Sequence, residues 1–394
     1  MVTSWGTMRA LAMNSAEVKS RTGARKQMFR SRLLSWYDAH ARALPWRESR
    51  DPYRVWLSEI MLQQTRVAAV IAHYEEFLRR FPTVEKLARA REASVLAAWS
   101  GLGYYRRARM LHAAAKVVVR QRAGKFPATA SELRDLPGIG RYTAAAIASI
   151  AFGEPVAVVD GNVERVLQRF FGRRFAGQDF WLTAEELLDR ERPGDFNQAM
   201  MELGATLCTP RGPVCLACPV LEMCATRGEM AGSAKTARQK KREIHYALDF
   251  RQDAGREGGA VFLVQRPRDA RLMAGMWDLP ELAGPVMGAD EQQIRRFARN
   301  DKMREKGHRM GDRTVTGSDP RLWFTVRHSI TVTDYRVRVW RMRMSAQSGL
   351  RGEWFGLDRL ARVALTGLAR KILRKAGLLG IRKKHTSADG AVWS

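Results

Sequence analysis

All four cysteines of this 394-residue chain lie within one short stretch, at Cys208, Cys215, Cys218 and Cys224. A disulfide framework spreads its cysteines to connect distant segments, so this grouping indicates a metal site in a reducing compartment. The stretch contains a single C-x2-C pair where zinc sites usually have two, and it lacks the closely spaced ligands of ferredoxin-type runs. The spacing favours a [4Fe–4S] cluster, with zinc as the alternative.

The charge of the chain is strongly basic: 68 Lys and Arg against 40 Asp and Glu give a net charge of +28. Such a surplus suits a polyanionic partner, although an Arg-rich composition alone would also produce it. We find no apolar run of about 18 residues and therefore predict no membrane span. Residues 1–26 are basic and lack the apolar region of a secretory signal. We expect a cytoplasmic, nucleoid-associated protein; a later start codon and organelle targeting stay open.

The order of sequence patterns predicts a multidomain chain. Helical periodicity runs from about residue 28 to 225, beginning in places with clear caps such as Asp51-Pro52. Small and charged residues follow, and then alternating β-branched and aromatic residues that indicate strands. The predicted parts are a basic flexible tail (1–27), an all-α module (28–225) with the metal loop (208–224), a linker (226–244), an α+β module (245–364) and a basic C-terminal helix and tail (365–394).

A glycine-containing turn, Leu136-Pro137-Gly138-Ile139-Gly140, separates two helical runs. Glycine permits positive φ and close approach of another molecule to the backbone. The free N–H groups of the helix that starts at Arg141 would favour an anion, and a phosphate bound there needs no readout of sequence. An ordinary turn between helices is the alternative.

Two carboxylates stand in unusual surroundings. Asp160 directly follows the apolar run Val156–Val159 and would either face a cleft or cap the next helix. Glu59 is flanked by apolar residues on a helix with a buried stripe, although a helical Glu is far more often solvated. The residues alone leave both alternatives open.

With these features, the chain resembles the helix-hairpin-helix glycosylase superfamily, which includes endonuclease III and the adenine-removing MutY type. The resemblance covers about residues 28–225 and rests on the cysteine spacing, the glycine turn, the W-L-S-E-I-M-L-Q-Q-T segment at 56–65 and V-D-G-N-V at 159–163. It implies an all-α glycosylase module whose four cysteines hold a [4Fe–4S] cluster. The segment at 56–65 is typical of the MutY type.

The resemblance implies a role for each carboxylate. Glu59 would protonate adenine at N7 and later activate the attacking water, while Asp160 would stabilise or trap the oxocarbenium-like sugar. Glu59 must then be protonated near neutral pH through burial, with Asp160 ionised. Tyr142 and Asn162 would orient Asp160 and the sugar. The expected reaction is hydrolysis of the N-glycosidic bond of adenine opposite 8-oxoguanine or guanine.

Tyr142 also separates this chain from related enzymes. Endonuclease III types carry a Lys after the Gly-Arg pair, and its amine forms a Schiff base that cleaves the strand. Here Gly140-Arg141 is followed by Tyr142, which predicts base removal with little lyase activity. A thymine-mismatch glycosylase shares the Tyr but lacks a Glu at the position of Glu59.

The resemblance assigns further residues to DNA and to the flipped base. Gln64 and Tyr104 would wedge into the base stack, and Gly138, Gly140 and Arg141 would contact the backbone. Trp46, Arg47 and Glu202 would line the adenine pocket. Core packing is the alternative for Tyr104 and Trp46.

The residues after the linker resemble the Nudix-like C-terminal domain of the MutY type, on Gly258–Pro267 and Gly275–Glu281. No R-E-x-x-E-E segment occurs in 282–299, so we expect lesion recognition and no pyrophosphatase activity. The family usually has Phe-Ser-His on a strand where this chain has Val326-Arg327-His328-Ser329. Arg327 would contact the modified base or a phosphate, or Ser329 would take over.

The predicted partner is double-stranded DNA with A opposite 8-oxoguanine or G, bound by a monomer, with no membrane involved. Two rival functions stay open. One is a cluster-bearing DNA-binding regulator without catalysis, which would not explain Glu59 and Asp160. The other is a bifunctional lyase, which Tyr142 opposes.

Overall fold

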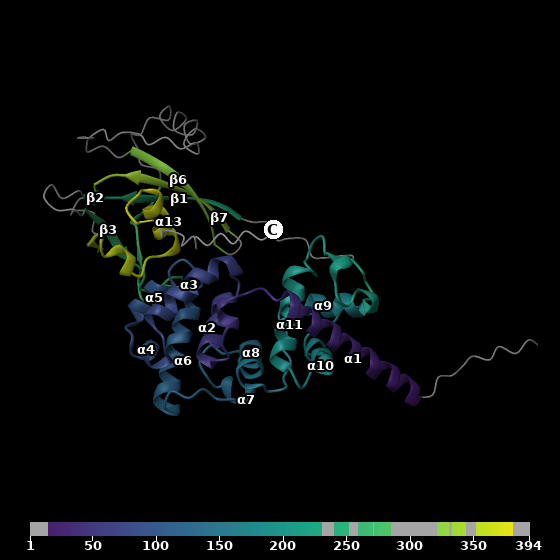
Figure 1. The fold of residues 1–394 in the computed structure, drawn as a ribbon. Coiled ribbons are helices and arrows are strands. Elements are labelled where there is room, and N and C mark those ends of the chain that lie inside the picture. Colours follow the sequence, from purple (N-terminus) through teal and green to yellow (C-terminus); the bar gives the residue numbers. More distant parts are fainter. Residues whose placement is uncertain are drawn as a thin grey trace, which may run out of the picture. The chain divides into compact units, whose positions relative to one another are not determined.

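The computed structural model describes residues 15–230, 240–251, 259–270, 272–284, 321–330, 333–343 and 352–380. The chain divides into two compact units (Figure 1). The first unit comprises residues 1–88 and 113–234, and the second comprises residues 89–112 and 235–394. The segment 89–112, which the sequence suggested as part of the helical module, therefore groups with the C-terminal residues.

The first unit is built from helices. They are α1 (Ser15–His40), η1 (Pro45–Arg47), α2 (Pro52–Leu62), α3 (Val67–Arg80), α4 (Val84–Arg89), α7 (Ala130–Leu133), α8 (Arg141–Phe152), α9 (Gly161–Phe171), α10 (Gln178–Leu187), α11 (Pro193–Thr206), η2 (Cys215–Ala217) and η3 (Leu221–Met223), with most of α6 (Arg106–Arg122). The predicted start of α2 is confirmed, because the Asp51 carboxylate accepts hydrogen bonds from the Tyr53 and Arg54 amides at 2.7 and 3.1 Å.

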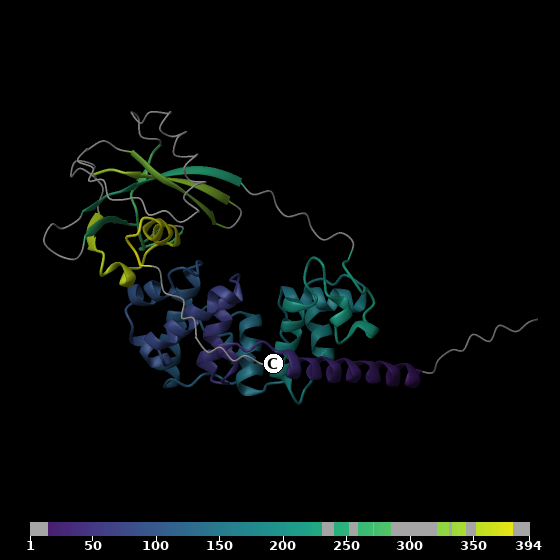
Figure 2. The same cartoon turned by 45° about the horizontal axis from the view of Figure 1, so that its top comes forward.

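Helix α1 begins at Ser15, inside the stretch expected as a flexible tail. Its later turns dock on the first unit, because Phe29, Leu33 and Tyr37 are buried in the same core as residues of α9 and α11. Figures 1 and 2 both show α1 running alongside α11 and extending past it. A basic stretch is compatible with a helix once one face has a core to pack against.

The second unit contains two sheets. One has the order β5 (Glu281–Leu282), β1 (Lys240–Leu248), β7 (Thr333–Arg341), β6 (Arg321–Ile330), in which β1 and β7 are parallel and the other pairs are antiparallel. The other joins β2 (Phe250–Arg251), β3 (Ala260–Gln265) and β4 (Trp277–Asp278), with β8 (Gly352–Gly356) also paired to β3. The expected strands are confirmed, although β1 begins within the stretch predicted as linker.

The second unit has an apolar core that is covered by helix α13 (Gly367–Lys375). This core also includes a residue of η5 (Leu360–Arg362). The apolar α13 residues Leu368, Ile372 and Leu373 are buried with Val337 and Val339 of β7. Helix α5 (Glu92–Trp99) and the first turns of α6 belong to the same unit. Residues 1–14, 231–239 and 381–394 of the predicted tails and linker, and most of 282–299, lie outside the described residues. Among the described helices, none has the length and apolar character that a membrane span requires.

Candidate active site

Helices α2 and α8 pack against each other and bring Glu59 to Tyr142. The Tyr142 hydroxyl donates a hydrogen bond of 2.6 Å to Glu59 Oε2. One turn away, the Gln63 side-chain amide donates to Thr143 Oγ1 at 3.2 Å, which fixes the register of the two helices. Glu59 is only 6% exposed, so the side chain that is usually solvated on a helix is here inside the protein.

Burial raises the pKa of the Glu59 carboxyl to about 7. The hydrogen bond from Tyr142 and the charge of Arg47 act against this rise, while the negative charge of Asp160 adds to it. Desolvation is the largest cause, because a carboxylate loses more hydration on burial than a carboxylic acid does. Glu59 therefore holds a proton in a large fraction of molecules at neutral pH.

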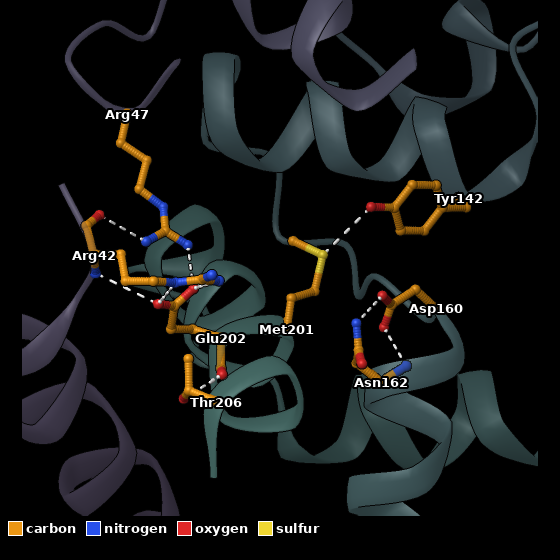
Figure 3. Close-up of polar contacts among 8 residues, drawn as sticks. All are labelled: Arg42, Arg47, Tyr142, Asp160, Asn162, Met201, Glu202 and Thr206. Carbon is orange, nitrogen blue, oxygen red and sulfur yellow. Dashed lines mark hydrogen bonds and ion pairs between the residues drawn. The ribbon is translucent and has the colours of Figure 1, made fainter. Parts of the chain in front are cut away.

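Asp160 caps α9 and also lies within electrostatic reach of Glu59. Its Oδ1 accepts hydrogen bonds from the backbone amides of Asn162 and Val163 at 2.9 and 2.8 Å, and its Oδ2 accepts one from Asn162 Nδ2 at 2.9 Å (Figure 3). The N-cap role of Asp160 is thus confirmed. The N–H donors at the helix start hold the carboxylate in one orientation and compensate its charge.

The segment that leads into Asp160 is held by side chains instead of by a sheet. The buried Asn197 accepts from the Val158 amide at 3.0 Å and donates to the Val156 carbonyl at 2.9 Å. Glu185 accepts from the Ala157 amide at 2.8 Å. Sequence analysis missed both residues, because a helical Asn or Glu gives no sign of the distant backbone it bonds.

Glu202 on α11 is almost completely buried between two arginines, Arg42 and Arg47. Arg42 contributes Nε and Nη2 at 2.5 and 2.8 Å, and Arg47 contributes Nη2 at 2.8 Å. Burial raises the pKa of Glu202, but the two arginines outweigh burial and lower the pKa overall. Figure 3 shows Met201 between this ion cluster and the Tyr142–Asp160 side, with its sulfur 3.4 Å from the Tyr142 hydroxyl. Arg42 and Met201 were not predicted.

Helices α9 and α11 approach closely where Gly204 faces Asn162. A Cβ at Gly204 would lie 2.6 Å from the Asn162 Cβ, so only glycine fits. Arg165 spans the contact, donating to Asn162 Oδ1 at 2.8 Å, to the Gly204 carbonyl at 2.6 Å and to the Cys208 carbonyl at 2.7 Å. Asn162, which bonds Asp160, is therefore connected through Arg165 to the start of the cysteine loop.

Comparisons with known proteins identify the family of the chain. Residues 57–178, which contain Glu59, Tyr142 and Asp160, match the HhH-GPD superfamily of base excision DNA repair proteins. The chain is 32% identical over 335 residues to the adenine DNA glycosylase of Schizosaccharomyces pombe, covering 68% of this chain and 72% of that protein. The chain belongs to the adenine DNA glycosylase family.

Other relatives match over a smaller share of their length. The human adenine DNA glycosylase is 41% identical over 313 residues, which cover 64% of this chain and 57% of that protein. The chain thus spans less than two thirds of the human protein. The solved structure of a thermostable thymine-DNA glycosylase is similar with a TM-score of 0.49 and 31% identity, covering 52% of this chain and 98% of that one.

The cysteine loop of this family member supplies four thiols, all half-buried and none in a disulfide. Cys208, Cys218 and Cys224 pack against the core that includes α9 and α11. Burial raises the pKa of Cys218 to about 11, and the three other cysteines contribute to that rise, so the four lie within electrostatic reach. Four neighbouring thiols have the donor chemistry of an iron–sulfur site. In the described part of the chain, however, no three metal-ligating side chains converge as they would around a bound ion.

The turn between α7 and α8 contains the glycines predicted to contact the DNA backbone. Gly138 adopts φ +77°, and Gly140 is the N-cap of α8 without a side-chain cap. The first amide groups of α8 therefore keep their N–H groups for an external acceptor. Arg141 is exposed, yet its guanidinium stacks on Trp181 at 3.8 Å and donates to Gln178 Oε1 at 2.6 Å.

The two predicted wedge residues share an uncommon backbone conformation. Gln64 has φ +55° and Tyr104 has φ +47°, and both side chains are exposed. Non-glycine residues at positive φ are strained and are concentrated at functional sites. By contrast, Trp46 is buried and packs edge-to-face on Tyr74 at 5.5 Å, which is the core packing named as its alternative role.

The three residues predicted to read the lesion differ in exposure and contacts on β6. Arg327 is exposed and pairs in register with Arg336 of β7. His328 is half-buried, and burial lowers the pKa of its imidazole, with the nearby Lys371 adding to that effect. The Ser329 hydroxyl donates to Asp334 at 2.5 Å. Of the three side chains, Ser329 is therefore hydrogen-bonded within the described part of the chain, while His328 lies only within electrostatic reach of Lys371.

Proposed function

We propose that this protein is an adenine-specific DNA glycosylase of base excision repair, which acts on adenine opposite 8-oxoguanine or guanine in double-stranded DNA. The observation that carries the proposal is the pairing of a buried Glu59, with a pKa near 7, with an Asp160 carboxylate held by three N–H donors. Two carboxyl groups in contrasting surroundings are what acid-assisted cleavage of a glycosidic bond requires.

The reaction would proceed in two steps. Protonated Glu59 gives its proton to adenine N7, and the C1′–N9 bond breaks with its electron pair passing to the base. The positive charge that develops on the sugar is stabilised by the Asp160 carboxylate. Glu59, now ionised, accepts a proton from a water molecule as its oxygen bonds to C1′. Tyr142 holds the Glu59 carboxyl in place, and Asn162 holds that of Asp160.

The side chains beside the two carboxyls suit a flipped purine. The Arg47–Glu202 pair presents a fixed donor and acceptor next to Met201, a soft apolar surface against which a base ring can pack. We assign adenine recognition to these residues, with Trp46 as support for Arg47 through the short helix η1. Tyr142 carries a phenol at the position where a lyase needs an amine, so the proposed enzyme removes the base without cleaving the strand.

We propose that the second unit recognises the base opposite adenine and that its fold is Nudix-like. Its mixed four-stranded sheet and covering helix α13 are compatible with that fold. Arg327 is our candidate for contact with 8-oxoguanine or an adjacent phosphate, because its guanidinium is exposed. His328 and Ser329 are assigned to supporting that strand, since each already has contacts within the protein.

We further propose that Cys208, Cys215, Cys218 and Cys224 hold a [4Fe–4S] cluster. The cluster would stabilise a loop that Arg169 already joins to α9, through bonds to the carbonyls of Thr209 and Pro210 at 2.7 and 3.0 Å. The chemistry that the bound cluster would supply is structural, with four iron–thiolate bonds closing the loop. Visible absorbance and four irons per chain in the purified protein would support this assignment.

Single-turnover excision tests the function directly. Duplexes with adenine opposite 8-oxoguanine, guanine, cytosine or thymine are incubated with excess protein, and products are separated with and without alkali. We expect release fastest opposite 8-oxoguanine, with strand breaks only after alkali. Equal rates opposite 8-oxoguanine and guanine would remove the role of the second unit. Binding without release of any base would favour the non-catalytic regulator, and breaks without alkali would favour the lyase.

A further inference from the structure

The loop Gly101–Tyr104, between α5 and α6, holds the Tyr104 ring outward in a strained backbone. Gly101, Gly103 and Tyr104 have φ of +111°, +71° and +47°, and Tyr104 is 46% exposed. A tyrosine in the left-handed region persists only where its surroundings determine that conformation. The position of the Tyr104 ring therefore depends on the residues that hold the loop.

Part of that support comes from the loop itself. The Trp99 indole N–H donates to the Gly103 carbonyl at 3.1 Å. The Arg107 guanidinium lies over the rings of both Tyr104 and Trp99, at 5.3 and 5.6 Å from their centroids. These contacts orient the Tyr104 ring relative to α6, but they do not fix the two ends of the loop.

Both ends are fixed by one carbonyl group just before α13. Ser100 precedes the loop and Tyr105 follows it, and their hydroxyls donate to the Leu365 carbonyl at 2.8 and 3.2 Å. Arg370 Nε donates to Ser100 Oγ at 2.7 Å. All four residues are at most 7% exposed, so water does not compete for these bonds.

Leu365 is itself held in place because both its neighbours in the chain are hydrogen-bonded. Thr366 caps α13 through Oγ1, which accepts from the Ala369 amide at 3.1 Å. The backbone of Trp277 on β4 bonds both neighbours of Leu365, donating to Ala364 and accepting from Thr366 at 2.9 Å each. The loop is thus attached to the start of α13 and to a sheet.

The same helix also holds the proposed recognition strand. Lys371 and Lys375 are one turn apart on α13 and donate to the β6 carbonyls of Arg327 and Thr325 at 2.6 and 3.0 Å. Among the described strands, β6 lies at the edge of its sheet, and these lysines bond carbonyls that no other described strand pairs. One short helix therefore connects β6 to the loop that carries Tyr104.

We propose that the Leu365 carbonyl and Arg370 position Tyr104 for insertion into DNA, so that α13 couples base recognition at β6 to extrusion of the adenine. This inference rests on the proposed function and on the sequence-based prediction that Tyr104 acts as a wedge. Unstacking a base is unfavourable, and a rigid ring offsets more of that cost than a mobile one. Loosening the anchor should therefore impair extrusion and leave the chemistry at Glu59 intact.

The test uses the full chain with Tyr105→Phe, which removes one hydroxyl and keeps the ring. We expect single-turnover adenine excision to slow about fivefold, the usual worth of one buried hydrogen bond. Fluorescence of 2-aminopurine placed beside the adenine should show a similar loss of unstacking. The matched control is Tyr53→Phe, which loses an equally buried hydroxyl bonded to the Phe81 carbonyl at 2.7 Å, away from the loop. The control should retain both the excision rate and the fluorescence change.

A double-mutant cycle with Tyr104→Ala separates positioning from general stability. If the anchor acts through the ring, Tyr105→Phe has no further effect once Tyr104→Ala is present. A fivefold loss in both backgrounds, or an equal loss in Tyr53→Phe, would overturn the proposal. If the wild-type protein releases no adenine, the proposed function fails. The fluorescence change on the bound duplex then decides alone, and it overturns the coupling if Tyr105→Phe leaves it unchanged.

Discussion

The carboxylate site of the first unit and strand β6 of the second unit are organised in opposite ways. Around Glu59 and Asp160, the polar side chains already bond one another before DNA is present. On β6 it is the backbone that is held, by Lys371 and Lys375, while the Arg327 side chain is exposed. Under the proposed function, the first region would be preorganised for chemistry, and the second would gain its contacts only on binding.

Glu59→Gln should have the largest effect, because an amide of the same shape cannot protonate adenine. We expect single-turnover excision opposite 8-oxoguanine to fall by about 10³-fold, within the range for loss of a general acid. Affinity for the duplex should stay within a few-fold, since the site remains packed. Glu164→Gln, an exposed change on α9, serves as the matched control. Excision at the wild-type rate in Glu59→Gln would remove this residue from the mechanism.

The sequence anticipated the part of the proposed site that depends on local structure. An Asp after an apolar run is a recognisable N-cap, and Asp160 both caps α9 and lies within electrostatic reach of Glu59. The sequence alone could not identify side chains that come into contact only after folding. Arg42 reaches Glu202 across 160 positions, and Asn197 reaches the segment before Asp160 across about 40. Neither spacing leaves a periodic signal.

The fold was anticipated to a similar extent. Periodicity identified the helices and the strands of the second unit, because both depend on near neighbours. It did not separate residues 89–112 from the helices around them. Their place in the second unit depends on buried bonds from Ser100 and Tyr105 to Leu365, some 260 positions later.

Arg327→Ala should have an intermediate effect that is confined to recognition. If Arg327 reads the modified base, the ratio of excision rates opposite 8-oxoguanine and guanine should fall about tenfold. Excision opposite guanine should hardly change.

Arg336→Ala is the matched control, because Arg336 is exposed and opposes Arg327 on β7. A phosphate contact by either arginine would weaken binding equally for all duplexes and reduce its salt dependence. An unchanged rate ratio in Arg327→Ala, together with weaker binding to every duplex, would therefore reassign Arg327 to the backbone.

Of these substitutions, Tyr142→Phe should have the smallest effect on the excision rate. The size of that effect should depend on pH. Excision by a protonated Glu59 should fall as pH rises through about 7, by up to tenfold for each further unit. The Tyr142 hydrogen bond opposes the rise in the Glu59 pKa, so its removal should raise that pKa further. The descending limb of the pH–rate profile then moves to higher pH.

The direction in which the descending limb moves separates two effects of Tyr142. Its hydrogen bond positions the Glu59 carboxyl, and the same bond lowers the pKa of that carboxyl. Rates of Tyr142→Phe near pH 6, where Glu59 is largely protonated in both proteins, should differ from wild type only through the lost positioning bond. Near pH 8 the variant should retain the larger protonated fraction, so its disadvantage should narrow or reverse. A descending limb that moves to lower pH, or does not move, would mean that another group supplies the proton. The buried Glu59 would then be a structural carboxyl. The carboxylate site could no longer be contrasted with strand β6 as a region preorganised for chemistry.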